Sequence, residues 1–102
     1  MLETRKANGE VITGSVKLIH AAGMHARPAV KLTKLAKRFQ AQISVRTSAT
    51  AEWINAKSVS KIMTLRAARD SVIEFEASGE DADAAVAALV ELVAADFPDS
   101  DP

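Results

Sequence analysis

The sequence predicts one α+β domain in which helices cover a single face of an antiparallel sheet. Segments typical of strands and helices follow one another in the order strand, helix, strand, strand, helix, strand, helix. This order is typical of an open-faced sandwich. The 102 residues suffice for one modest hydrophobic core and are too few for two. We therefore expect a four-stranded antiparallel sheet covered on one face by three helices.

The first half of the domain predicts a strand, a helix and a second strand. Branched residues recur over residues 11–19, and the predicted strand ends at residues 20–24. Alternating apolar and polar residues over 41–46 predict a second strand with one buried face. Between them, apolar residues recur every three or four positions, which predicts an amphipathic helix with the apolar positions Ala29, Leu32, Leu35, Ala36 and Phe39.

The second half predicts two further strands and two further helices. Residues 52–54 are expected to form a hairpin with the second strand, and Ser58 is expected to cap a short helix. Alternation over residues 73–77 predicts the fourth strand, which Gly79 ends. The last helix should begin near Asp81 and stop at Pro98. Its predicted apolar stripe consists of Val86, Leu89, Val90, Val93 and Phe97.

Composition predicts the ends of the domain as well as its compartment. Residues 1–10 are polar and aperiodic, so we expect a flexible extension, a domain over 11–96, and a disordered tail or the start of a linker over 97–102. Thirteen Lys and Arg balance thirteen Asp and Glu, which disfavours binding to nucleic acid. The absence of cysteine suits a reducing compartment, and the sequence has no apolar run of membrane-spanning length. We expect a cytoplasmic protein without membrane insertion.

The segment over residues 23–29 lies where a strand gives way to a helix, and its residue types suit one chemical task. Gly23 permits an unusual backbone turn, while Ala26 and Pro28 fit the first helical turn. This predicts that His25 lies at or near the helix N-cap. Backbone amides and the positive end of the helix dipole favour an anion there, and Arg27 adds a forked set of donors. A phosphate on the His25 ring would therefore be held.

The expected strength of this site suits a carrier. Each dipole or exposed charge contact is worth about 0.3–1 kcal/mol, so a phosphoryl group would be held without being trapped. A hydrolase or kinase would need a second general base, a metal cluster or a glycine-rich phosphate loop, and the sequence shows none of these. The alternative is that His25 is an ordinary loop histidine. A metal site formed by His20 and His25 would lack a third ligand, so we expect no metal and no cofactor.

Two segments, residues 23–29 and 55–59, resemble the signature segments of the histidine-containing phosphocarrier (HPr) family of the bacterial phosphoenolpyruvate-dependent phosphotransferase system. The resemblance covers roughly residues 11–95 and includes the acidic turn at 79–81. It implies that His25 accepts a phosphoryl group on its ring Nδ1 from enzyme I and passes it to a histidine of a IIA component. It implies that Arg27 neutralises the phosphate, and that the chain is a carrier and not an enzyme.

The resemblance also implies a partner surface, formed by the histidine loop and the apolar side of the short second helix. In this sequence that surface would comprise Val30, Lys34, Lys37, Val59, Lys61 and Met63. The alternative is that Val59 and Met63 belong to the core and that the lysines are merely solvated. A carrier that must visit two partners with one face is expected to be a monomer.

Ser58 aligns with a serine that a dedicated HPr kinase/phosphorylase modifies in some members of the family, although helix capping explains this residue equally well. Three further alternatives stay open. The chain could be a regulatory paralogue in a nitrogen- or metabolism-linked relay, or one domain of a multidomain phosphotransferase. In a different class, it could be a ligand-sensing module, for which the sequence shows no polar pocket.

Overall fold

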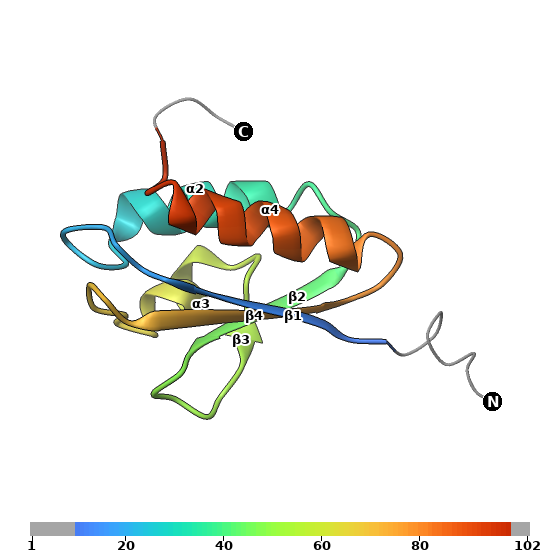
Figure 1. Ribbon diagram of the computed structural model, residues 1–102, viewed down its shortest axis with the longest axis horizontal. Coiled ribbons are helices and arrows are strands. Elements are labelled where there is room, and N and C mark those ends of the chain that lie inside the picture. Colours follow the sequence, from blue (N-terminus) through green and yellow to red (C-terminus); the bar gives the residue numbers. More distant parts are fainter. Residues whose placement is uncertain (1–9, 99–102) are drawn as a thin grey trace.

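A computed structural model describes residues 10–98, and it contains the predicted elements in the predicted order (Figure 1). Residues 1–9 of the predicted extension and residues 99–102 of the predicted tail lie outside the described residues. The elements are β1 (Ile12–Lys17), α2 (Ala26–Ala36), β2 (Gln42–Thr47), β3 (Ile54–Asn55), α3 (Val59–Met63), β4 (Val72–Ser78) and α4 (Ala82–Ala94). None of the described helices is long and apolar enough to cross a membrane.

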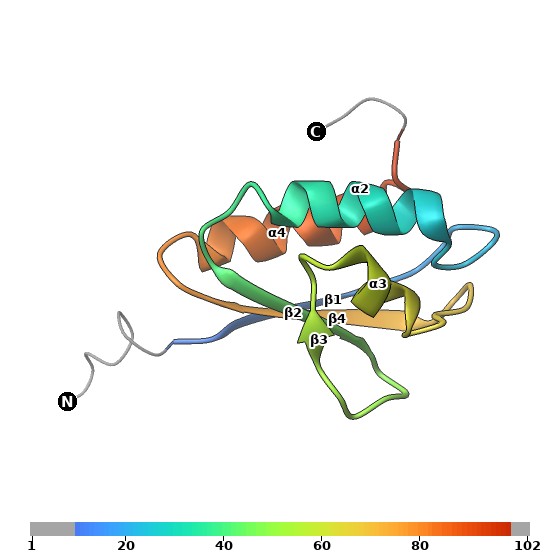
Figure 2. The same ribbon diagram turned by 180° about the vertical axis from the view of Figure 1, so that it is seen from behind.

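The four strands form one antiparallel sheet in the order β1-β4-β2-β3. β4 lies inside the sheet, where Phe75 is opposite Gly14 of β1 on one side and Val45 of β2 on the other. The helices α2 and α4 lie over one face, with α3 beside α2 (Figures 1 and 2). This arrangement confirms the predicted open-faced sandwich.

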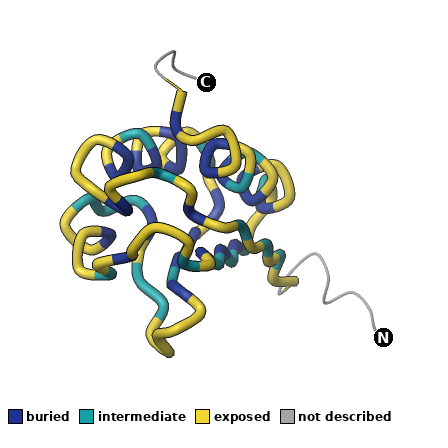
Figure 3. The backbone as a smooth tube through the Cα atoms, turned by 60° about the vertical axis from the view of Figure 1, so that its left-hand side comes forward, coloured by how far each residue is buried: buried dark blue, intermediate teal, exposed yellow. Residues whose placement is uncertain are grey.

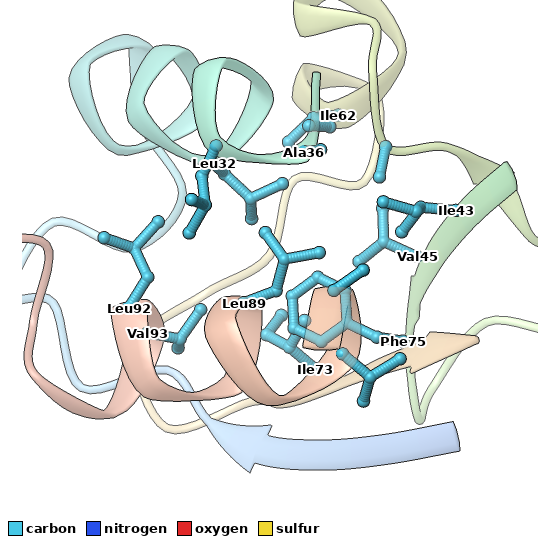
Figure 4. Packing of buried hydrophobic residues seen from close by; sticks show 14 of the residues in the cluster. Leu32, Ala36, Ile43, Val45, Ile62, Ile73, Phe75, Leu89, Leu92 and Val93 are labelled. Atoms are coloured by element: carbon cyan, nitrogen blue, oxygen red, sulfur yellow. The ribbon is translucent and has the colours of Figure 1, made fainter. Parts of the chain in front are cut away.

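The core fills the space between the sheet and the helices, and exposed residues concentrate in the loops (Figure 3). Alternation along β2 and β4 turns every second side chain toward the helices, as the burial of Ile43, Val45 and Phe75 shows. Leu32 of α2 and Leu89 of α4 point into the same space (Figure 4). Burying one such side chain fully is worth about 1.5–3 kcal/mol.

The third strand differs from the predicted one by its position and length. Only Ile54 and Asn55 pair with β2, opposite Val45 and Ser44 respectively, whereas residues 52–54 were expected to pair. The Asn55 side chain ends the strand, because its Oδ1 accepts a hydrogen bond from the Lys57 amide at 2.9 Å.

Trp53 lies just before β3, where it stacks on a side chain of β2. The guanidinium carbon of Arg46 is 4.3 Å from the centroid of the indole ring. The Arg46 Nε also donates to Glu74 Oε1 at 2.7 Å. Trp53 therefore belongs to a polar cluster on the sheet, outside the hydrophobic core cluster between sheet and helices.

The last helix ends earlier than predicted, at Ala94, and its end is closed by the backbone. The amide of Phe97 donates to Leu92 O and that of Asp96 to Val93 O, each at 3.0 Å. These two bonds form a Schellman motif, which turns the chain before Pro98 is reached. Phe97 is only 1% exposed, so the core extends one residue into the segment that sequence analysis assigned to the tail.

Two other predicted boundaries were too wide. β1 excludes Val11 and Ile19, which are 51% and 44% exposed. At the second of these ends, Leu18 exchanges backbone hydrogen bonds with Asp70 and Ser71 after the strand has ended. α2 stops at Ala36, so Phe39 packs against the core from the following turn.

Candidate functional site

His25 is the N-cap residue of α2, as the sequence predicted. Its backbone is extended (φ −92°, ψ −177°), and its carbonyl accepts the first helical hydrogen bond from the Ala29 amide at 3.0 Å. The amides of Ala26 and Arg27 precede that bond and therefore have no acceptor one turn earlier in the helix. Pro28 has no amide to leave unpaired. The helix start thus presents donors and the positive dipole end beside an exposed imidazole.

Backbone contacts on both sides of His25 fix the loop that carries it. Gly23 adopts φ +74°, and its amide donates to His20 O at 2.9 Å. A Cβ at Gly23 would lie 2.6 Å from Ala67 O, so only glycine fits. The Met24 amide donates to the same Ala67 oxygen at 2.9 Å, and the Met24 side chain is buried. His25 is thus exposed at the end of this loop, and the two residues before it, Gly23 and Met24, are held in place by these contacts.

The outer side of α2 next to His25 is cationic. Arg27 is exposed in the first turn, and a shallow hollow of about 400 Å³ runs from it along the helix. The residues lining this hollow are Ala26, Arg27, Val30, Lys31 and Lys34. An anionic group on His25 would therefore lie next to a positive surface.

The predicted partner residues lie on α2 and α3, two helices that are in contact, and at Lys37, the C-cap residue of α2. Val30 is 42% and Met63 is 37% exposed, while Val59 is half-buried against the core. Val59 thus contributes to the core and is also partly exposed, whereas Val30 and Met63 are surface residues. The basic residues predicted for this surface are all exposed: Lys34, Lys37 and Lys61.

Ser58 is the N-cap residue of α3, and its side chain makes the predicted capping contact. The hydroxyl oxygen accepts from the Lys61 amide at 3.3 Å and lies 3.2 Å from the Ser60 hydroxyl. The residue is half-buried, so the cap is at the surface of the domain.

His20 contacts the end of the last helix, a contact that sequence reasoning missed. Its Nδ1 lies 2.9 Å from Asp96 Oδ1, and its ring meets Phe97 edge-on with centroids 6.0 Å apart. Over the described residues, no group of three or more His, Cys, Asp or Glu side chains could hold a metal ion.

Known proteins share this architecture and sequence. The family model described as "PTS HPr component phosphorylation site" matches residues 12–95. The chain is 35% identical over 79 residues to phosphocarrier protein HPr of Neisseria meningitidis serogroup B, covering 78% of this chain and 86% of the relative. It is 36% identical over 83 residues to phosphocarrier protein NPr of Escherichia coli K12, covering 81% and 91% respectively.

A solved structure agrees with these relatives. The crystal structure of HPr-C-His from Thermoanaerobacter tengcongensis superimposes with a TM-score of 0.79 at 31% identity, covering 87% of this chain and 98% of that one. Fold and sequence together define a phosphocarrier of the phosphotransferase system, as opposed to a catalytic enzyme. The chain belongs to the HPr family.

Proposed function

We propose that this chain accepts a phosphoryl group on His25 from phospho-enzyme I and passes it to IIA components. The observation that carries the proposal is the position of His25, which is exposed at the N-cap of α2 on a loop anchored through Gly23 and Met24. A nucleophile for phosphoryl transfer needs this combination of access and fixed geometry.

The helix start suits both steps of such a relay. In the first step a ring nitrogen of His25 forms a bond to phosphorus as the donor's phosphorus–nitrogen bond breaks. In the second step the acceptor's histidine forms a bond to phosphorus as the bond between phosphorus and His25 breaks. The amides that open α2 and the Arg27 guanidinium can stabilise the phosphoryl oxygens, each by about 0.3–1 kcal/mol. The group is then held loosely enough to leave.

We propose that partners dock on the surface formed by α2 and α3. Val30 and Met63 give this surface an exposed apolar centre, and the lysines named above give it a positive rim. Such a surface fits partners whose docking face is apolar at its centre and acidic at its edge.

Phosphorylation by enzyme I and phosphoenolpyruvate tests the proposal directly. Intact mass spectrometry should show one phosphate on the native chain that acid removes, and none on His25→Ala. His20→Ala is the matched control, which should still reach one phosphate per chain at the end point. Full labelling of His25→Ala, or none of the native chain with the enzyme I of its own organism, would contradict the proposal.

The similarity to phosphocarrier protein NPr favours a second pathway for the same chemistry. In that case donor and acceptor belong to a nitrogen- or metabolism-linked regulatory relay and not to sugar uptake. Offering the phosphorylated chain to IIA proteins of both branches separates the two, because the faster acceptor identifies the pathway.

We also propose Ser58 as a site of regulatory phosphorylation. A phosphate there would lie at the start of α3 and next to the docking surface, where it would repel an acidic partner. Incubation with a cognate HPr kinase and ATP should give an acid-stable phosphate that is absent in Ser58→Ala. If the native chain takes up no acid-stable phosphate, this regulatory role is excluded.

A further inference from the structure

The segment that follows α4 is joined to the loop that carries His25. The Nδ1 of His20 lies 2.9 Å from Asp96 Oδ1, and since a carboxylate only accepts, Nδ1 carries the proton. The His20 ring meets the Phe97 ring at an interplanar angle of 85°. On α2, the Lys31 ammonium donates to Pro98 O at 2.9 Å. We call Asp96, Phe97 and Pro98 the C-terminal clasp.

The clasp has a fixed backbone of its own. Phe97 is buried, and the Schellman motif holds Asp96 at φ 61°, a position where glycine is the usual residue. An aspartate there accepts backbone strain, and its carboxylate contacts His20. The family model matches only as far as residue 95, so the clasp lies beyond the matched segment.

A short series of hydrogen bonds leads from the clasp to His25. The His20 carbonyl accepts from the Gly23 amide at 2.9 Å, and the Gly23 carbonyl accepts from the His25 amide at 3.0 Å. Each bond spans only two or three residues, so the position of His20 sets the turn from which His25 enters α2. Asp96 is the side chain that holds the polar edge of the His20 ring.

We propose that His20 is a positioning residue for phosphoryl transfer at His25, held in place by Asp96. This role rests on the proposed function of His25. Neither His20 nor Asp96 is among the docking side chains proposed on and beside α2 and α3. Loss of the His20–Asp96 contact should therefore lower kcat, while KM for the partner stays unchanged.

Two substitutions of Asp96 separate positioning from simple stabilisation. Asp96→Gly suits the left-handed backbone but removes the acceptor, whereas Asp96→Asn tolerates that backbone and keeps an acceptor oxygen. With the chain as the varied substrate of enzyme I, we expect kcat to fall about three- to tenfold for Asp96→Gly and His20→Ala, at unchanged KM. Asp96→Asn should keep the native kcat. The thermal midpoint of Asp96→Gly should be no lower than that of the native chain.

Native kcat in both Asp96→Gly and His20→Ala would overturn the proposal, and so would a kcat that falls only together with the thermal midpoint. If the native chain takes no more phosphate than His25→Ala, the proposed function itself fails. Amide hydrogen exchange then tests the clasp separately. Exchange at Gly23 and His25 should be at least about tenfold faster in Asp96→Gly, and unchanged protection would overturn the coupling.

Discussion

The hydroxyl of Thr33 is buried in α2 at 2% exposure, and among the described residues its Oγ1 has no hydrogen-bond partner. A buried donor without a partner keeps the cost of its lost hydration. The unsatisfied hydroxyl of Thr33 therefore lowers the stability of the domain.

Thr33→Val should raise the free energy of unfolding by about 1 kcal/mol, because it replaces the unsatisfied hydroxyl with a methyl group of similar size. Urea titration measures this change. Thr64→Val is the control, since the Thr64 hydroxyl donates to Lys61 O and its loss should not stabilise the domain. Equal or lower stability of Thr33→Val would show that the hydroxyl is satisfied in solution.

Among the elements, α4 is joined to the loop before β2 by the residue at its N-cap. Asp81 makes no capping bond to its own helix, and its carboxylate instead accepts from the amides of Gln40 and Ala41, each at 2.8 Å. The Gln40 amide is the main cause that holds the pKa of Asp81 below its ordinary value of 3.8, and desolvation opposes it. The charged carboxylate of Asp81 thus joins the start of α4 to the loop before β2, which lies 40 residues earlier in the chain.

This contact predicts a specific dependence of stability on pH. Because the folded pKa of Asp81 is the lower one, its contribution is complete above the unfolded value of 3.8 and disappears as the pH falls through the folded pKa. The difference in urea midpoint between the native chain and Asp81→Asn should be constant near pH 7 and shrink below about pH 4. A difference that persists unchanged to pH 2 would contradict this assignment.

Periodicity predicted most elements, and it failed where an element ends. The alternation in β4 and the stripe in α4 were visible because their buried residues are regularly spaced. Phe97 follows Val93 at helical spacing, yet it is buried from a turn, and spacing alone does not distinguish the two. A two-residue strand such as β3 is too short to show alternation.

The sequence predicted those parts of the candidate site whose residues lie close together in the chain. Gly23, His25 and Pro28 lie within six residues of one another, and each implies a backbone conformation that the structure contains. The contact between His20 and Asp96 spans 76 residues. It depends on how the topology brings the end of α4 to the loop after β1, which no sequence pattern expresses.

The molecule as a whole is neutral, but its charges are segregated. No lysine or arginine follows Arg69, and Glu52 is the only acidic residue between His20 and Arg69. Ten of the thirteen basic residues thus lie between Arg27 and Arg69, the part of the chain that contains α2 and α3, while β4 and α4 carry acidic residues. A neutral protein with this distribution presents a positive face to a partner.

Association with an acidic partner should accordingly slow as salt is added, despite the zero net charge. We expect the association rate constant with enzyme I to fall roughly tenfold between low and high ionic strength. Stopped-flow measurements on Lys34→Glu with Lys37→Glu should show a weaker salt dependence. Asp83→Asn with Glu91→Gln on α4 is the matched control and should keep the native dependence. A salt-independent rate for the native chain would contradict electrostatic steering.

The central place of β4 in the sheet also decides when the chain can fold. β1 and β2 do not pair with each other, and both pair with a strand that ends at Ser78. On the ribosome these two strands are therefore made long before the strand that joins them, and we expect the complete sheet to form only after β4 has been made. Until then β2 can pair only with the two residues of β3, and its edge toward β4 has no partner strand. Most of the domain must therefore be synthesised before it can fold, and the unfolded nascent chain has to avoid aggregation until then.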